Sequence, residues 1–291
     1  MKKINYIELG ATLFVPATHQ ELESIVCHNK YPELKSVLID TEDGINDSSL
    51  EMALESISEL LKIYKKKKLL VFIRPRNINV LERILQLENI KNIDGFILPK
   101  FSLENAQNYL ELLDESNFLL MPSIEGKELF NQNSLYELRD ILLKYRENIL
   151  LLRFGLEDIL RQLKMKRSCE ESAFYFSAIS YVLGSFIATF KSAGFAISGG
   201  VYPCFKDRDG FIKDIKRDLK EGLFSKTIIH PNQIEAINEL YKVSKEELEE
   251  ALQICKSDNA VFNQNDKMAE VVTMKPYAQE MILRAEVYGV V

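Results

Sequence analysis

Residues 149–158 read ILLLRFGLED, an apolar run that ends at a glycine and is followed by acidic residues. The run is apolar nearly throughout instead of alternating between apolar and polar side chains. This pattern is typical of a parallel strand, because helices cover both faces of a parallel sheet. The stretch therefore predicts a buried strand that ends near Gly155, with acidic residues behind it.

Seven more runs of this kind occur along the chain, and helix-like sequence fills the gaps between them. They are ATLFVP (11–16), SVLID (36–40), LLVFIR (69–74), GFILPK (95–100), FLLMPSIE (118–125), GFAISGG (194–200) and KTIIHP (226–231). Eight strand–helix units in one chain predict a closed (β/α)8 TIM barrel of the α/β class. We expect the active site at the C-terminal ends of the strands, where barrels of this type carry it.

The domain organisation follows from the same pattern. Residues 1–240 are predicted to form the barrel, and residues 241–291 a C-terminal helical extension that caps the site or reaches a neighbouring subunit. Helices are expected at 49–64, 80–90, 103–114, 134–147, 157–163, 170–192 and 211–222 in the barrel, and at 245–257 and 276–289 in the extension.

Charge and composition exclude several classes of partner. The net charge of −6 and the isoelectric point of about 5.4 disfavour binding to nucleic acid or to an anionic membrane. Residues 173–190 carry no charge over a length near the minimum for a membrane span. Serine, threonine and glycine dilute this run, and it lies where the barrel needs a helix. We therefore predict a buried helix and no membrane partner.

The cysteines indicate the compartment. Cys27, Cys169, Cys204 and Cys255 lie far apart with no CxxC pair, and no apolar segment follows the opening MKKINYIELG. Both observations favour a reduced cytoplasmic protein without a structural zinc site.

Two carboxylates follow neighbouring strands. Glu125 comes after the fifth predicted strand and Asp158 after the sixth. Adjacent barrel strands bring such residues close together, and Mg²⁺ prefers one or two carboxylates together with water and substrate oxygens. The alternatives are an exposed loop acid for Glu125 and a helix N-terminal residue for Asp158.

Arg74 ends the third strand, and the acids Asp40, Glu42 and Asp43 follow the second. An arginine at a barrel mouth can bind a carboxylate with two parallel hydrogen bonds, or it can form a structural salt bridge with these acids. Three acids in four residues repel one another unless a cation or metal lies near. Arg74, Glu42 and Asp43 are the catalytic candidates, with one acid organising Arg74 or water.

Lys100 and His230 end the fourth and eighth strands. Lys100 is a candidate substrate-binding residue or Schiff-base nucleophile, and otherwise a cation that balances the acids. His230 precedes Pro231 at a helix start, so it contacts a ligand or stabilises that turn.

Taken together, the motifs resemble those of a known family. In the order FVPA, DTEDG, FIRPR, GFILPK, SIEG, FGLED, KTIIHPNQI and then DKM…KP…A, they resemble the citrate lyase β-subunit-like family. This family belongs to the HpcH/HpaI aldolase and citrate lyase superfamily of C–C bond lyases. The resemblance extends from about residue 12 to residue 286.

The resemblance implies a TIM-barrel lyase, often trimeric, with Mg²⁺ held at the positions of Glu125 and Asp158. It assigns the keto-acid carboxylate to Arg74 and an acidic pair to Glu42 and Asp43. Members cleave or form a bond between a keto-acid fragment, such as oxaloacetate, pyruvate or glyoxylate, and an acyl thioester. The expected partners are therefore a small keto acid, an acyl thioester such as that of CoA, and further copies of the chain.

The chain departs from the family pattern at several positions. RQLK (161–164) replaces an Asp-Leu-Gly step, and VPA replaces the usual VPG. Met274 stands where members acting on malyl- or citramalyl-type thioesters often carry an aspartate. Thioester hydrolysis or condensation in the same pocket is the alternative within enzymes. The other alternative is an inactive regulatory barrel that binds metal and keto acid, in the branch that accompanies tellurite- and stress-resistance operons.

Overall fold

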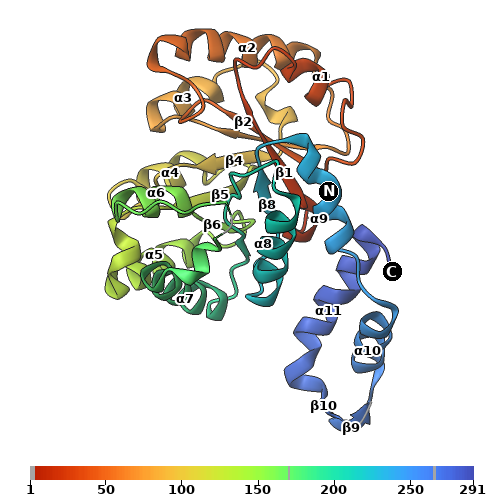
Figure 1. Ribbon diagram of the computed structural model, residues 1–291. Helices are drawn as coiled ribbons and strands as arrows, with labels where there is room; N and C mark the ends of the chain where they lie inside the picture. The colour runs from red at the N-terminus through yellow and green to blue at the C-terminus, as the bar shows by residue number, and fades with distance from the viewer. Residues whose placement is uncertain (1–3, 170, 265–266) are drawn as a thin grey trace. The chain divides into compact units, whose positions relative to one another are not determined.

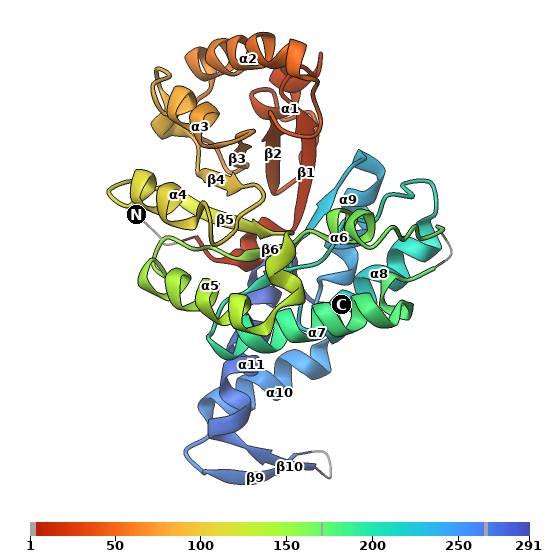
Figure 2. The same cartoon turned by 90° about the vertical axis from the view of Figure 1, so that its left-hand side faces the viewer.

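The computed structural model describes residues 4–169, 171–264 and 267–291. Eight parallel strands form one sheet in the order β7-β6-β5-β4-β3-β2-β1-β8 (Figures 1 and 2). The strands are β1 (Ala11–Pro16), β2 (Ser36–Asp40), β3 (Leu70–Arg74), β4 (Gly95–Leu98), β5 (Leu119–Ile124), β6 (Leu152–Phe154), β7 (Ile197–Ser198) and β8 (Lys226–Ile228). A parallel bridge between Gly199 and Lys226 brings the two edges together, so the barrel is nearly closed. The predicted TIM barrel is confirmed.

Helices connect the strands and pack on the outside of the sheet (Figure 2). They are α1 (Leu22–Val26), α2 (Leu50–Ile63), α3 (Ile78–Leu85), α4 (Ala106–Leu113), α5 (Gln132–Lys144), α6 (Leu156–Gln162), α7 (Ser177–Ser192) and α8 (Arg208–Lys220). Another helix, α9 (Ile234–Leu240), comes after β8 in the chain. Short 3₁₀ turns are η1 (Tyr6–Leu9), η2 (Asp47–Ser49), η3 (Ile90–Asn92), η4 (Lys127–Phe130), η5 (Ala173–Tyr175) and η6 (Pro231–Gln233).

Two of the helices predicted in the barrel differ most from the structure at their ends. The helix expected at 80–90 is α3, which begins at Ile78 because the Asn77 side chain accepts a hydrogen bond from the Val80 N–H. The chain has already left the helix at Asn89, whose φ is +62°. The helix expected at 170–192 begins only at Ser177, since Phe176 before it is extended. Within the described residues, no helix combines the length and hydropathy that a membrane crossing requires.

The inside of the barrel is built in two layers. The lower layer is an apolar cluster that includes one residue from each of several strands or strand approaches: Leu38, Phe72, Ile97, Met121 and Leu151, with Leu9 from η1. Side chains on one face of a strand recur every second residue. The residues that follow four of the cluster members by two positions are polar: Asp40, Arg74, Ser123 and Arg153. A polar layer therefore lies directly on the apolar one, toward the C-terminal ends of the strands.

The chain divides into two compact units, residues 1–234 and residues 235–291. The sequence placed this boundary after residue 240. In the second unit, α10 (Lys245–Lys256) packs against α11 (Val271–Tyr288), and the antiparallel strands β9 (Val261–Gln264) and β10 (Lys267–Glu270) connect them (Figure 1). The core of this unit contains Ala251, Ile254, Ala278 and Met281.

The structure of the second unit differs from the prediction for the C-terminal extension, residues 241–291. The last helix was expected to begin at Pro276, yet α11 begins at Val271 and contains Pro276. Pro276 is the sixth residue of α11 and has no N–H group, so the helix lacks the hydrogen bond that this position would otherwise donate to the Val272 carbonyl. The residues before α11 form the hairpin β9–β10, which the sequence did not indicate.

Candidate active site

An ion-pair cluster lies at the ends of β2 and β3. Arg74 Nε lies 2.5 Å from Asp40 Oδ1, and Arg74 Nη1 lies 3.0 Å from Glu42 Oε2. Asp40 is fully buried, and its second oxygen accepts a hydrogen bond from the Gly44 N–H at 2.7 Å. Although burial disfavours the charged form, the ion pairs with Asp40 and Glu42 raise the pKa of Arg74. Both carboxylates thus hold this guanidinium in place.

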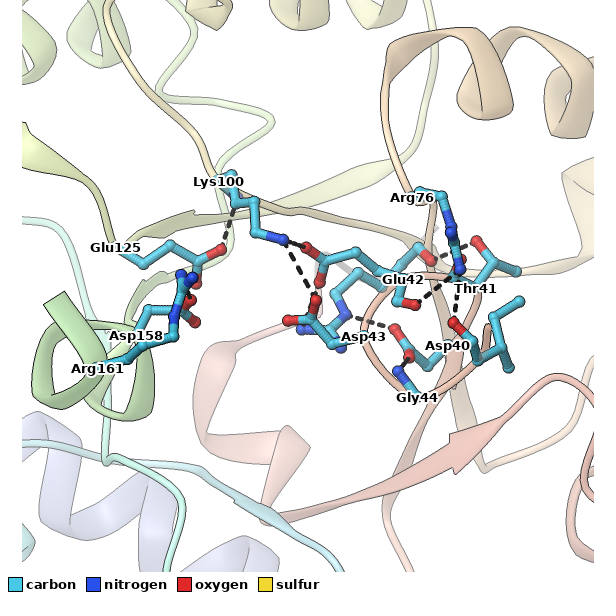
Figure 3. Close-up of polar contacts among 12 residues, drawn as sticks. Asp40, Thr41, Glu42, Asp43, Gly44, Arg76, Lys100, Glu125, Asp158 and Arg161 are labelled. Carbon is cyan, nitrogen blue, oxygen red and sulfur yellow. Dashed lines mark hydrogen bonds and ion pairs between the residues drawn. The ribbon is translucent and has the colours of Figure 1, made fainter. Parts of the chain in front are cut away.

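Lys100 extends the cluster toward β4 (Figure 3). Its Nζ lies 2.6 Å from Glu42 Oε1 and 3.2 Å from Asp43 Oδ1. Burial raises the pKa of Glu42 in spite of the positive charges of Arg74 and Lys100. Lys100 balances the acids in this arrangement, and its side chain stays 51% exposed.

Glu125 and Asp158 form the second half of the site, beyond Lys100 in Figure 3. Glu125 follows β5 and is only 7% exposed, and its Oε1 accepts a hydrogen bond from the Lys100 backbone N–H at 2.8 Å. Lys100 has a left-handed φ of +47°, which is part of the tight turn after β4. Asp158 belongs to the first turn of α6. Burial, together with the charges of Asp158 and Glu42, raises the pKa of Glu125 to about 7.

Local contacts fix this acidic pair. Gly155 precedes α6, and a Cβ atom there would lie 2.2 Å from the Cβ of Glu125, so the close approach requires glycine. Arg161 Nη2 lies 2.6 Å from Asp158 Oδ1. Gln162, the last residue of α6, donates a hydrogen bond to the backbone oxygen of Glu125 at 2.6 Å. RQLK, a departure from the family pattern, therefore supplies two residues that position the acids.

The donor set fits Mg²⁺. The charge of Asp158 helps to raise the pKa of Glu125, and a divalent cation bound to both carboxylates would relieve this repulsion. The described residues contain no group of three or more His, Cys, Asp or Glu side chains placed to hold a metal. A two-carboxylate site suits Mg²⁺, which keeps several water or substrate ligands. It does not suit a structural zinc ion, which needs four protein ligands.

The sequence reasoning missed Arg153. This residue lies in the middle of β6, and its Nη2 donates a hydrogen bond to Thr227 Oγ1 of β8 at 2.5 Å. The side chain is deep enough that burial, with the nearby charge of Arg74, lowers the pKa of Arg153 to about 10. A single charged residue inside the run ILLLRFG was the available signal.

His230 has structural partners. Its ring stacks on Phe205 with centroids 4.6 Å apart, and its Nδ1 accepts a hydrogen bond from the Asn232 N–H at 3.3 Å. It thereby caps η6. Ligand contact by His230 stays a prediction.

The expectation of four reduced cysteines is wrong for two of them. Cys169 and Cys204 form a disulfide, and Cys27 and Cys255 are free thiols. The sequence separation of 35 residues concealed the pair. The barrel topology brings together the loop after α6 and the loop after β7, and Cys169 and Cys204 lie in these two loops.

Met274 packs against the core between α10 and α11. The position predicted to correspond to the family's aspartate is therefore an apolar packing position.

Acidic residues and an arginine thus lie together at the C-terminal ends of the strands, the face on which TIM-barrel enzymes carry their active sites. The sequence profile of C–C bond lyases of the TIM-barrel fold matches residues 3–290. The chain belongs to this family of carbon–carbon lyases, and the predicted citrate lyase β-like resemblance is confirmed.

Individual relatives are distant. The chain is 36% identical to (3S)-malyl-CoA thioesterase of Cereibacter sphaeroides, but over only 25% of each protein. It is 23% identical to citrate lyase subunit beta of Haemophilus influenzae, over 83% of this chain and 82% of that protein. The fold is similar to that of CitE from Mycobacterium tuberculosis, solved with magnesium, acetoacetate and coenzyme A. The TM-score is 0.70 at 18% identity, with 97% of this chain and 99% of that chain covered.

Proposed function

We propose that this protein is a Mg²⁺-dependent lyase that cleaves or forms the bond between a keto-acid fragment and an acyl thioester. The observation that carries the proposal is the pairing of Glu125 with Asp158 at the barrel mouth, beside the Arg74 cluster. A solved neighbour with magnesium, acetoacetate and coenzyme A supports both the metal and the ligand class. In the cleavage direction the substrate would be a 3-hydroxy acyl thioester whose carbon 3 also carries the carboxylate that is released in the keto acid.

Glu125 and Asp158 would hold the metal, which supplies Lewis-acid polarisation of the oxygen that becomes the keto group. Arg74 would bind the carboxylate of the keto-acid fragment through the N–H donors that Asp40 and Glu42 leave available. Lys100 would keep the acids after β2 in position.

In the cleavage direction, a base removes the proton of the substrate hydroxyl group. The oxygen electrons form the new carbonyl, and the C–C bond pair moves to the α-carbon of the acyl group as an enolate. Glu42 is our candidate base, because burial raises its pKa in spite of its two cationic neighbours and because it contacts Arg74, the proposed ligand of the substrate carboxylate. Asp43, which contacts the same lysine, is more exposed and would assist by orienting Lys100.

Thioester hydrolysis is the second candidate function. The local similarity to (3S)-malyl-CoA thioesterase favours it, and the apolar packing of Met274 weighs against it. The two reactions differ in products: a lyase releases a keto acid and leaves the thioester intact, whereas a hydrolase releases a free thiol. The homotrimer, the cytoplasmic location and the regulatory alternative also stay predictions.

The test is turnover of 3-hydroxy acyl-CoA thioesters with two parallel readouts, one for released keto acid and one for free thiol. We expect keto acid without thiol, dependent on Mg²⁺, with Glu125→Gln and Asp158→Asn both losing activity and metal affinity. Glu157→Gln is the matched control, because Glu157 lies beside Asp158 in α6 but pairs with Arg167 instead.

Calorimetric titration of oxaloacetate, pyruvate and glyoxylate, with and without Mg²⁺, tests the pocket itself in wild type and Arg74→Ala. Retained metal affinity in both acid variants, or binding of no keto acid by wild type, would overturn the proposal. Thiol release without keto acid would establish hydrolysis in its place.

A further inference from the structure

Arg153 points into the barrel. Its neighbour Phe154 packs outward against Phe186 of α7, with ring centroids 5.4 Å apart. Successive side chains of a strand point to opposite faces, so Arg153 shares the inner face with Leu151 of the apolar cluster. The hydrogen bond to Thr227, which comes from β8, crosses that interior. Arg153 therefore stands in the polar layer together with Arg74.

The two guanidinium groups of this layer differ in their partners. Arg74 has two carboxylates, Asp40 and Glu42. Within the described residues, the hydrogen-bond partner of Arg153 is a neutral hydroxyl, that of Thr227. A guanidinium has five N–H donors, so this bond leaves most of them available. Part of the Arg153 surface also stays accessible.

A half-buried charge whose hydrogen-bond partner is neutral is costly, because the protein interior solvates it less well than water does. Here the positive charge of Arg74 adds to that cost, and Glu125 offsets it in part. An anion that enters the barrel mouth would remove this cost and would gain a planar, two-pronged hydrogen-bond partner. The arrangement is suited to a ligand and is poorly explained as a stabilising contact.

We propose that Arg153 binds a second anionic group of the substrate, so that the pocket selects a dicarboxylate fragment over a monocarboxylate. This inference rests on the proposed function, since it takes the keto-acid pocket as its premise. Arg74 would bind the carboxylate next to the keto group, and Arg153 the distal one. Thr227 is a positioning residue that fixes the guanidinium.

The experiment is calorimetric titration of four probes into the full-length protein with Mg²⁺: oxaloacetate and succinate as dicarboxylates, and pyruvate and acetate as monocarboxylates. We expect wild type to bind each dicarboxylate more tightly than its monocarboxylate counterpart. Arg153→Gln should weaken dicarboxylate binding by about 10- to 100-fold, the effect of losing a charged hydrogen-bond donor. Its binding of pyruvate should change less than about twofold.

Three further variants separate binding from structure. Arg153→Lys keeps the charge and should recover part of the dicarboxylate affinity, also in the event that Arg153→Gln folds poorly. Thr227→Val removes the positioning hydroxyl and should weaken the dicarboxylates alone. Arg83→Gln is the matched control, because Arg83 pairs with Glu51 on the outer helices α2 and α3, and it should bind all probes as wild type does.

Equal affinity of wild type for dicarboxylates and monocarboxylates would overturn the inference, as would an equal loss for both classes in Arg153→Gln. Absence of dicarboxylate binding in wild type would overturn it too. A different result would refute the proposed lyase and still support the inference. This result is dicarboxylate binding that depends on Arg153, together with no effect of Mg²⁺ and no thioester turnover.

Discussion

At the scale of single residues, the ionisation of Glu125 couples the site to the stability of the protein. Burial and the neighbouring carboxylates raise its folded-state pKa to about 7 from an ordinary value of 4.5. An acid whose pKa rises on folding stabilises the folded state below its unfolded pKa, and this contribution is lost as the pH rises through the folded value. The metal-free protein should therefore lose stability between about pH 5 and pH 7.5.

The loss is on the order of 3 kcal/mol if the full difference is expressed. Chemical unfolding in the presence of a chelator, at pH values across this range, measures it in wild type and Glu125→Gln. The free energy of unfolding of the variant should depend less on pH than that of wild type. Mg²⁺ should stabilise wild type increasingly as the pH rises, because the metal binds the carboxylate form. Parallel pH profiles for wild type and variant would contradict the assignment.

The sequence placed charged residues at the strand ends, and the structure brings several of them into contact there, while their roles stay predictions. Asp40, Glu42, Arg74, Lys100 and Glu125 form one connected set of contacts, since parallel strands end at the same rim. Arg153 could not be found in that way, because it lies within its strand. Its inward orientation depends on which face of β6 meets the helices, and only the packing of Phe154 decides that.

At the scale of elements, the disulfide links two loops of the catalytic face. Cys169 follows α6, the helix that carries Asp158, and Cys204 follows β7. A cross-link that closes a loop of 35 residues stabilises the fold by about 3–4 kcal/mol in the chain-entropy account. Cys169→Ser and Cys204→Ser should therefore each lower the free energy of unfolding by a similar amount, since each breaks the same bond.

Thiol titration of unfolded, unreduced protein provides the direct check. Two thiols, Cys27 and Cys255, should react before reduction and four after it. Four reactive thiols in the unreduced protein, or unequal losses of stability in the two serine variants, would contradict the pairing. Cysteine spacing alone could not reveal this bond, because the pairing depends on two loops that only the barrel brings together.

At the scale of the whole molecule, the sequence was most informative where the chain repeats. Eight buried strands with helices between them have few alternatives to a barrel, because each apolar strand needs helical cover on its outer face and neighbours inside. The second unit has no such repeat. Its hairpin β9–β10 is exposed at Val261 and Met268, so its sequence lacks the buried pattern that made the barrel strands recognisable.

The second unit has its own core and its own polar anchor, which leads to a prediction about how the chain unfolds. Arg284 of α11 donates hydrogen bonds to the backbone oxygens of Tyr241 at 2.7 Å, Lys242 at 3.0 Å and Leu240 at 3.2 Å. Carbonyl groups at the end of a helix such as α9 lack partners within that helix, so one guanidinium satisfies three of them. Arg284→Gln should lower the stability of residues 235–291 by at least about 2 kcal/mol.

Amide hydrogen exchange distinguishes a local effect from a global one. Protection in α10 and α11 should fall by about 30-fold or more, because a loss of about 2 kcal/mol in stability corresponds to this factor in an equilibrium constant. Protection in β2 to β5 should stay within about twofold of wild type. Arg139→Gln is the matched control, because the half-buried Arg139 of α5 pairs with its neighbour Asp140, and it should leave both units unchanged. Equal loss of protection in the barrel strands would mean that the two units unfold as one, because a contact confined to residues 240–284 can reach β2 to β5 only through a shared unfolding transition.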